Sequence, residues 1–224
     1  TRLVREGEFY INTTRLIGVD GTNGDSISEG MQRGRDECHK LFNIFRKHIP
    51  GFEHAGIKAI APQVGIRETR RIVGDFIMKV EDLVEDRDFD DCIGFSMYGW
   101  DLPDPDKPAH QPFASDTTAG YKYKVKKGLS TPLPYRIMIP RPVKNLICPG
   151  RAVSVEGQVL GPVRVMAPCM AMGEAAGVAS AQVVNDGVSF DSVDVNRLRA
   201  RLKKLGALVD RDQLPKIYPR VDQV

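Results

Sequence analysis

The sequence predicts an α/β protein, and three patterns in its 224 residues support that fold class. Apolar residues recur at helical spacing over 26–49, which predicts an amphipathic helix. Alternating polar and apolar residues on both sides of that segment predict strands. A later segment, 168–185, is rich in Ala and Gly, which indicates a helix that a sheet or a flat ligand can approach closely.

Composition is that of an ordinary globular protein. The chain has 32 Lys and Arg against 29 Asp and Glu, and 42% of its residues are hydrophobic, so it is not a disordered polyelectrolyte. Its 21 Gly and 15 Pro follow no period, which excludes collagen and predicts a loop-rich fold. No apolar run approaches the roughly 18 residues of a membrane helix. We therefore expect no membrane partner.

The four cysteines lie far apart, each in an apolar setting, without the spacing of metal ligands. We expect no metal site and four reduced, buried thiols, which is typical of a cytoplasmic protein. The chain begins with Thr1, and its first residues do not form a signal peptide. We expect a processed product or part of a longer polypeptide. The cysteines are Cys38, Cys92, Cys148 and Cys169.

In the N-terminal half, residues 1–19 alternate as a β-hairpin or two strands would. Ser26 and Glu29 have the spacing of a capping box that opens the helix over 26–49. Residues 57–78 have the apolar pattern of a strand, and 79–91 that of a short acidic helix and loop. The Pro-rich segment 101–120 predicts a long loop of the kind that often carries function.

In the C-terminal half, the basic strip Tyr121–Lys127 allows two interpretations. It could bind nucleic acid, but an edge strand protected by lysines explains it as well, and we favour the strand and no nucleic-acid partner. Short strands are predicted at 135–139 and 145–148. Further on, we predict a helix from Pro168 that ends at Gly187, a helix from the N-cap Asp194 to Gly206, and a polar tail.

Residues 146–181 carry the chemistry. A predicted strand ends in Pro149-Gly150-Arg151, and a Gly-containing loop leads to the small-residue helix. The N-terminus of a helix favours negative charge on a ligand, because its first N–H groups have no partner within the helix. For the helix alone, packing on a sheet explains the Ala and Gly residues better, and the ligand interpretation gains from the preceding Pro-Gly-Arg and from Arg164–Ala167.

This segment resembles the C-terminal flavin-binding segment of FAD-dependent oxidoreductases with a two-dinucleotide-binding-type fold. The resemblance rests on Gly-Arg at 150–151, Leu-Gly at 160–161, Arg-Val-Met at 164–166 and Cys-Met-Ala-Met-Gly-Glu-Ala-Ala-Gly at 169–177. Residues 65–74, 133–140 and 18–22 resemble other signatures of the same group. The matches therefore extend from the predicted hairpin to Gly177.

The resemblance implies an α+β substrate-side sheet joined to the C-terminal part of a Rossmann-like FAD-binding domain. It divides the chain into a substrate-side or cap domain at 1–140, an FAD-binding segment at 141–187, and a C-terminal helix and tail at 188–224. In the family that the chain resembles, a Gly-x-Gly-x-x-Gly fingerprint binds the ADP pyrophosphate. That fingerprint is absent from this sequence. The resemblance therefore implies a C-terminal half that needs an N-terminal half or second chain with the ADP-binding βαβ unit.

The resemblance also implies site residues for FAD and for a small-molecule substrate. The catalytic candidates are Arg164, Tyr135 and His110, and the resemblance also implies that Arg71 lies near the substrate cavity. The FAD-binding candidates are Gly150, Arg151, Gly161, Arg164, Val165 and Met166, and the substrate-binding candidates are Arg67, Arg70 and Arg136.

Several of these assignments have alternatives. Arg70 and Arg71 are adjacent in a predicted strand, so they point to opposite faces and cannot both line one pocket. Cys169 could be a redox thiol, but packing explains it better without a second nearby cysteine. Members of the family that it resembles often carry a histidine in the region that matches Gly157 and another near Pro103, and this chain has neither. The proton-accepting base would then be Glu156, Asp101, His110 or a residue of the missing half.

Two functions follow. The first is hydride transfer between a small organic substrate and FAD, with this chain supplying the cavity, the helix N-terminus and Arg contacts. The alternative is a non-catalytic subunit or binding module that keeps the flavoprotein fold.

Overall fold

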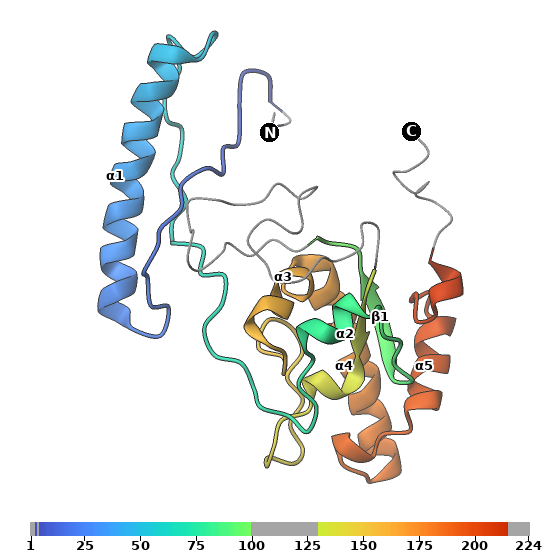
Figure 1. Ribbon diagram of the computed structural model, residues 1–224. Helices are drawn as coiled ribbons and strands as arrows, with labels where there is room; N and C mark the ends of the chain where they lie inside the picture. The colour runs from blue at the N-terminus through green and yellow to red at the C-terminus, as the bar shows by residue number, and fades with distance from the viewer. Residues whose placement is uncertain (1–2, 4, 100–129, 215–224) are drawn as a thin grey trace. The chain divides into compact units, whose positions relative to one another are not determined.

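A computed structural model of the chain describes residues 3, 5–99 and 130–214 (Figure 1). These residues form two compact units, Thr1–Thr69 and Arg70–Val224. The predictions for 101–120, for Tyr121–Lys127 and for the end of the tail lie outside the described residues. Within the described ranges, every helix is too short or too polar to span a lipid bilayer.

The first unit is built around one long helix, α1 (Gly24–His48). Its N-cap is Asn23, whose side-chain oxygen accepts hydrogen bonds from the backbone amides of Asp25 and Ser26 at 2.9 and 3.1 Å. The helix is confirmed, but the predicted capping box is wrong. Asn23 takes the capping position, and the Ser26 hydroxyl instead accepts a bond from the backbone amide of Asp20 at 2.9 Å.

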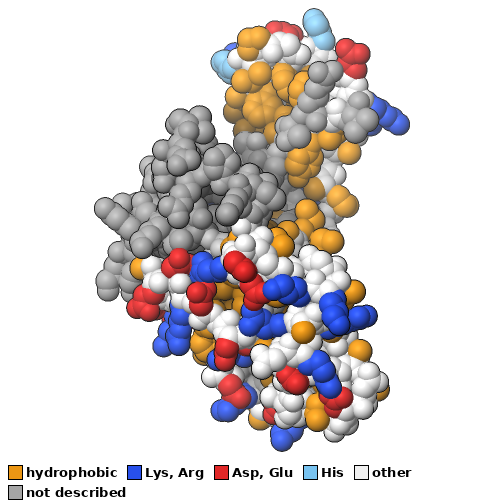
Figure 2. Space-filling view, turned by 90° about the vertical axis from the view of Figure 1, so that its right-hand side faces the viewer, with side chains coloured by type: hydrophobic (Ala, Val, Ile, Leu, Met, Phe, Trp, Pro, Cys, Tyr) orange, Lys and Arg blue, Asp and Glu red, His pale blue; other side chains and the backbone are white. Residues whose placement is uncertain are grey.

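Extended chain packs along α1 without forming a sheet. The Val19 side chain lies so near Gly30 that a Cβ there would come within 2.9 Å of it. At the other end, the Phe52 ring packs against the rings of Phe9 and Phe45, with centroid distances of 5.7 and 6.0 Å. Among the described residues of this unit only Gly30 is buried. Figure 2 shows hydrophobic side chains on the surface of the molecule. The large exposed hydrophobic residues of this unit include Phe9, Tyr10, Ile11, Ile17, Ile44 and Ile49.

The predicted strands at 1–19 and 57–78 are wrong. The described residues of 1–19 contain one isolated bridge position, at Phe9, and 57–69 contain none. The rest of the second segment, 70–78, belongs to the other unit and makes two isolated bridges, Gly74 with Pro140 and Met78 with Val155. Alternating residues favour an extended backbone, but a strand also needs a hydrogen-bonded neighbour along its length.

The second unit contains the core and a two-stranded antiparallel sheet. Strand β1 (Cys92–Ser96), which the sequence analysis did not predict, pairs with β2 (Thr131–Pro134). The long helix α4 (Met166–Asp186) packs against β1 and α5 (Val195–Lys204), and α2 (Val80–Val84) confirms the predicted short acidic helix (Figure 1). Fully buried side chains from these and neighbouring segments include Met78, Ile93, Leu133, Ile137, Leu160, Met172, Leu198 and Leu202.

The two strands predicted after β2 are wrong. Tyr135–Met138 forms a 3₁₀ helix, which closes with a bond from the Ile139 amide to the Arg136 carbonyl at 3.3 Å. Asn145–Cys148 has no strand, because the chain turns at Asn145, where φ is +56°, and makes only one bond to this 3₁₀ helix, from Cys148 to Met138.

The bounds of the two long C-terminal helices, α4 and α5, agree closely with those predicted from the sequence. Helix α4 starts at Met166, two residues before the predicted first position, and ends at Gly187 in the left-handed conformation with φ of +65°. Helix α5 is capped by Asp194, whose carboxylate accepts a bond from the Arg197 amide at 3.1 Å. The shorter helices of this unit are the 3₁₀ segments Gly157–Val159, Phe190–Ser192 and Arg211–Gln213, and α3 (Leu160–Val163).

The cysteines are reduced in this structure, and only Cys92 is fully buried. The expectation that all four are buried is therefore wrong, because Cys38, Cys148 and Cys169 are partly exposed. Among the described residues, no group of three or more His, Cys, Asp or Glu side chains could hold a metal ion.

Candidate functional site

The corner between α3 and α4 contains most of the residues that the sequence analysis assigned to a cofactor. Gly161 is buried within α3, Arg164 closes that helix, and Val165 is the N-cap of α4. Since the Val165 side chain has no oxygen, it makes no capping hydrogen bond to the first turn of α4. Pro168 has no N–H group and the Cys169 amide bonds to the Val165 carbonyl, so the amides of Met166 and Ala167, with the positive end of the helix dipole, are the groups at this end that a ligand could use.

Helix α4 is apolar on two opposite faces. One face, which includes Met172, Ala175 and Ala179, is completely buried in the core of the second unit. The other face is a stripe that we call the α4 outer stripe, and its members are hydrophobic or lack a side chain. It consists of Met166 (83% exposed), Met170 (73%), Gly173, Gly177, Ala181 and Val184 (79%).

The glycines of the α4 outer stripe leave room for another molecule. A Cβ added at Gly173 or at Gly177 would have no heavy atom within 4 Å. A helix with apolar residues all round is normally buried on all sides. The α4 outer stripe is therefore an exposed apolar surface on a helix whose opposite face lies in the core.

The Pro149-Gly150-Arg151 loop approaches the start of α4. Gly150 adopts φ of +100°, which a residue with a side chain would rarely accept, so the sharp turn there depends on glycine. Burial raises the pKa of the Cys169 thiol, and the positive charge of Arg151 partly offsets that rise. The positive charge of Arg151 therefore acts on Cys169 in the first turn of α4.

Cys169 itself behaves as a packing residue. Its thiol lies 3.4 Å from the carbonyl oxygen of Arg164, in the geometry of a weak hydrogen bond. Because its pKa is raised, the group is a thiol and not a reactive thiolate.

The segment 70–78 runs beside 152–156 and is tied to it at four points. The Ile72 amide donates to the Ala152 carbonyl at 2.8 Å, and the Gly74 amide to the Ser154 hydroxyl at 3.0 Å. Farther along, the Met78 amide donates to the Ser154 carbonyl at 3.1 Å, and the Glu156 amide to the Met78 carbonyl at 2.9 Å. A Cβ at Gly74 would lie 2.5 Å from the Ile139 carbonyl oxygen, so only glycine fits this approach.

Arg71 extends from this tied segment over the backbone of Gly157. The nearest guanidinium nitrogen would lie 3.5 Å from a Cβ added at Gly157. Exposure alternates along the segment, with Arg71 and Val73 exposed and Ile72 half-buried, which places Arg71 on the outward face. The sequence analysis had placed Arg71 beside the substrate cavity only by resemblance, because nothing in the sequence links residues 71 and 157.

A family model described as "FAD dependent oxidoreductase" matches residues 2–202. The chain belongs to the FAD-dependent oxidoreductase family. The match includes α1 and the second unit as far as residue 202, within α5. Comparisons with curated proteins and with solved structures found no match.

Family membership indicates an enzyme that depends on FAD. It also implies that the fold has Rossmann-like parts. The residues at the start of α4 fit such a cofactor. An uncapped helix N-terminus accepts partial negative charge, and small or unbranched residues such as Gly173 and Met170 let a flat ring system lie against the helix.

Two of the predicted site residues of this flavoprotein, Arg136 and Tyr135, make contacts within the second unit that hold the fold together. The Arg136 guanidinium bonds to the carboxylate of Asp91 and forms an ion pair with Asp90, and it stacks on the Phe76 ring. Tyr135 is buried, and its hydroxyl donates a hydrogen bond to the Phe190 carbonyl at 3.0 Å. These contacts account for both side chains structurally, and a substrate or catalytic role for them stays a prediction.

The remaining predicted residues are not brought to this corner. Arg70 is exposed and lies next to Arg71 in the sequence. Arg67 belongs to the first unit, whereas the α3–α4 corner belongs to the second. His110 and Asp101 lie outside the described residues. The Glu156 carboxylate accepts a hydrogen bond from the Val80 amide at 3.0 Å, so it supports the start of α2.

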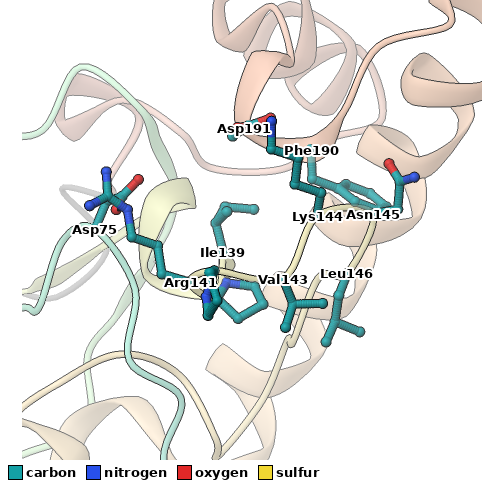
Figure 3. Close-up of a pocket in the computed structure, with 11 residues that line it drawn as sticks. Asp75, Ile139, Arg141, Val143, Lys144, Asn145, Leu146, Phe190 and Asp191 are labelled. Atoms are coloured by element: carbon teal, nitrogen blue, oxygen red, sulfur yellow. The ribbon is translucent and has the colours of Figure 1, made fainter.

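A shallow hollow of about 390 Å³ lies elsewhere on the second unit (Figure 3). Arg141 is paired with Asp75 on one side of it, and Lys144 lies near Asp191 on the other. Its apolar lining comes from the 139–146 loop and Phe190, and it includes none of the predicted site residues.

The support that β1 gives to the corner was missed by the sequence analysis. The Ser96 hydroxyl, at the end of β1, donates to the Pro162 carbonyl in α3 at 2.6 Å, and Gly94 packs closely against Ala171 of α4. The short apolar run Cys92-Ile93 before Gly94 is a strand signal that could have predicted β1.

Proposed function

We propose that this chain supplies the flavin-facing and substrate-facing portion of an FAD-dependent oxidoreductase that transfers hydride between a small organic substrate and FAD. When bound, the flavin would supply the redox chemistry. Gly150, Arg151 and the segment Arg164–Met166 would hold and orient it, and the α4 N-terminus would favour negative charge at its pyrimidine edge.

We further propose that the chain works with a polypeptide segment that carries the ADP-binding βαβ unit, in the same protein or in a second chain. One observation supports this above all: the α4 outer stripe is apolar and exposed, although the opposite face of the same helix lies in the core. A second observation is that no two glycines in the sequence are separated by a single residue, so the chain has no Gly-x-Gly-x-x-Gly of its own.

The test is an absorption spectrum and an intact-mass measurement on the protein purified from its native source. We expect flavin bands in the scan window of roughly 300–550 nm, together with polypeptide mass that accounts for the βαβ unit. The variant Met170→Glu places a charge in the α4 outer stripe, so this variant should lose both the flavin bands and the additional polypeptide mass. Leu205→Glu is the control, because Leu205 is an exposed hydrophobic residue (50%) on a different helix, at the end of α5.

A colourless, folded and solitary chain would contradict this proposal. It would favour the second candidate, a non-catalytic subunit or binding module that keeps the fold. The contacts of Glu156 and Tyr135 favour that candidate too, because each is engaged in structural hydrogen bonds and neither is presented as a base.

A further inference from the structure

We propose that Ser96 is a positioning residue for the flavin. Its hydroxyl keeps α3 from continuing into α4, and so leaves the backbone amide of Met166 free to bind the cofactor. This inference rests on the proposed function, because it names a residue that shapes the same site. Ser96 does not touch the cofactor and acts through the carbonyl group of Pro162.

The Ser96 hydroxyl is buried and engaged on both sides at the end of β1. Only 2% of the residue is exposed, and its hydroxyl donates a hydrogen bond to the Pro162 carbonyl oxygen in α3 at 2.6 Å. The same hydroxyl oxygen accepts a hydrogen bond from the Tyr98 amide at 3.3 Å. Because a carbonyl oxygen can only accept and an amide can only donate, the hydroxyl proton points to Pro162.

The carbonyl that Ser96 engages is the one that a continuous helix would use. In an α-helix each amide bonds to the carbonyl four residues earlier, so the Met166 amide would bond to the Pro162 carbonyl. Here the helix is interrupted at Val165, which is extended with φ of -74° and ψ of 165°. Helix α4 therefore begins anew at Met166, and Ser96 takes the acceptor that the Met166 amide would otherwise use.

The strand that carries Ser96 also contacts α4. Gly94 lies two residues earlier in β1, and a Cβ added there would lie 3.4 Å from the Ala171 side chain. Strand β1 therefore touches α4 at Gly94 and α3 at Ser96. Ser96 also pairs with Thr131 in the ladder with β2, so both helices are held against a strand that is itself fixed.

A second side chain reaches the next carbonyl groups at the end of α3, but with a weaker donor. The Cys169 thiol lies 3.4 Å from the carbonyl oxygen of Arg164. A thiol donates a weaker hydrogen bond than a hydroxyl does. Ser96 therefore supplies the stronger of the two side-chain bonds that hold the break between α3 and α4.

The first experiment measures hydrogen exchange of the Met166 amide by NMR in the flavin-free full chain. In the unaltered protein we expect rapid exchange, because the first amide of a helix has no carbonyl partner within that helix. In Ser96→Ala the Pro162 carbonyl loses its donor, so the Met166 amide should bond to it and exchange about 10-fold more slowly. Ser96→Thr keeps the hydroxyl, so its Met166 amide should exchange as in the unaltered protein.

The second experiment measures the affinity of the purified protein for FAD by flavin fluorescence. We expect Ser96→Ala to bind FAD about 10-fold more weakly, the effect of one lost hydrogen bond, and Ser96→Thr to bind it normally. Ser154→Ala is the matched control, because Ser154 is also completely buried and its hydroxyl accepts a bond from the Gly74 amide, not from α3 or α4. It should lower the urea midpoint of unfolding to a similar extent and leave the affinity for FAD unchanged.

Unchanged exchange of the Met166 amide in Ser96→Ala would overturn the proposal. Slower exchange with unaltered affinity for FAD would overturn it too, and so would an equal loss of affinity in Ser154→Ala. If exchange slowed as expected but the unaltered protein bound no FAD, the proposed function would fail and with it the flavin role of Ser96, while its part in separating α3 from α4 would stand. Ser96→Cys is the milder variant if Ser96→Ala does not fold, and its Met166 amide should exchange at an intermediate rate.

Discussion

The carboxylate of Asp91 accepts three hydrogen bonds from Arg136, two from the guanidinium at 2.8 Å each and one from the backbone amide at 2.9 Å. The two residues are 45 positions apart in the sequence, and Asp91 is buried. The bonds to Asp91 raise the pKa of Arg136, so its guanidinium stays charged. This pair fixes the turn after β2 to the loop before β1.

We predict that Asp91→Ala lowers the free energy of unfolding by about 2–3 kcal/mol, because the partly buried guanidinium loses its main acceptor. Urea unfolding followed by circular dichroism measures the change. Asp90→Ala is the control and should have little effect, since Asp90 is 90% exposed and its pair with Arg136 is screened by water. Equal losses in both variants would show that Asp91 has no special part in the fold.

Tyr135 predicts a specific response to alkaline pH. Burial raises the pKa of its phenol, and the Asp191 carboxylate raises it further. Below a pH of about 10, the ordinary tyrosine pKa, folded and unfolded states both keep the proton. Above it the unfolded state loses the proton while the folded state keeps it, so the free energy of unfolding falls as pH rises.

Tyr135→Phe should remove this part of the alkaline dependence. It should also cost about 1 kcal/mol at neutral pH, because the hydrogen bond to the Phe190 carbonyl is lost. Ultraviolet titration of the folded protein and of Tyr135→Phe gives a second readout, in which the absorbance that Tyr135→Phe lacks should appear above pH 10, the ordinary tyrosine pKa. If that absorbance appeared at the ordinary pKa, the burial of Tyr135 in this structure would be refuted.

The two glycines of the α4 outer stripe report whether something covers it. For the chain without a partner, Gly173→Ala should stabilise by about 0.5–1 kcal/mol, because alanine has the higher helix propensity and the space is open. With cofactor or partner bound, the added methyl should instead weaken that binding. Thermal unfolding of both forms distinguishes the two effects.

Gly187→Ala is the control of opposite sign. Gly187 has φ of +65° at the end of α4, so alanine there should destabilise by about 1 kcal/mol whether or not a partner is bound. A stabilising effect of Gly173→Ala that persists in the complex would mean that the α4 outer stripe is not the contact surface.

Glu156 can be tested as a catalytic base. We expect Glu156→Gln to keep the acceptor oxygen for the Val80 amide and to lower stability by less than about 1 kcal/mol. Flavin content and turnover should then be unchanged within a factor of a few. A fall in kcat of roughly 100-fold or more at normal flavin content would instead assign Glu156 as the base.

Local signals in the sequence were sufficient to predict α1, the end of α4 and the start of α5, and to identify the family. The apolar spacing from Ile27 to Phe45 indicated α1, Asp194 indicated the start of α5, and Gly187 the end of α4, because caps and helical faces depend on residues within a turn or two. The resemblance that rested on residues 146–181 was likewise correct at the level of the family.

Pairings between distant residues were decided only in the folded chain. The alternation at 71–78 indicated an extended backbone, and exposure does alternate there, but whether that backbone joins a sheet depends on partners that the pattern does not specify. The same applies to Arg136, which Asp91 engages, and to Arg71, which reaches Gly157. A side chain's role follows from what long-range packing places beside it, and the residue type alone leaves that open.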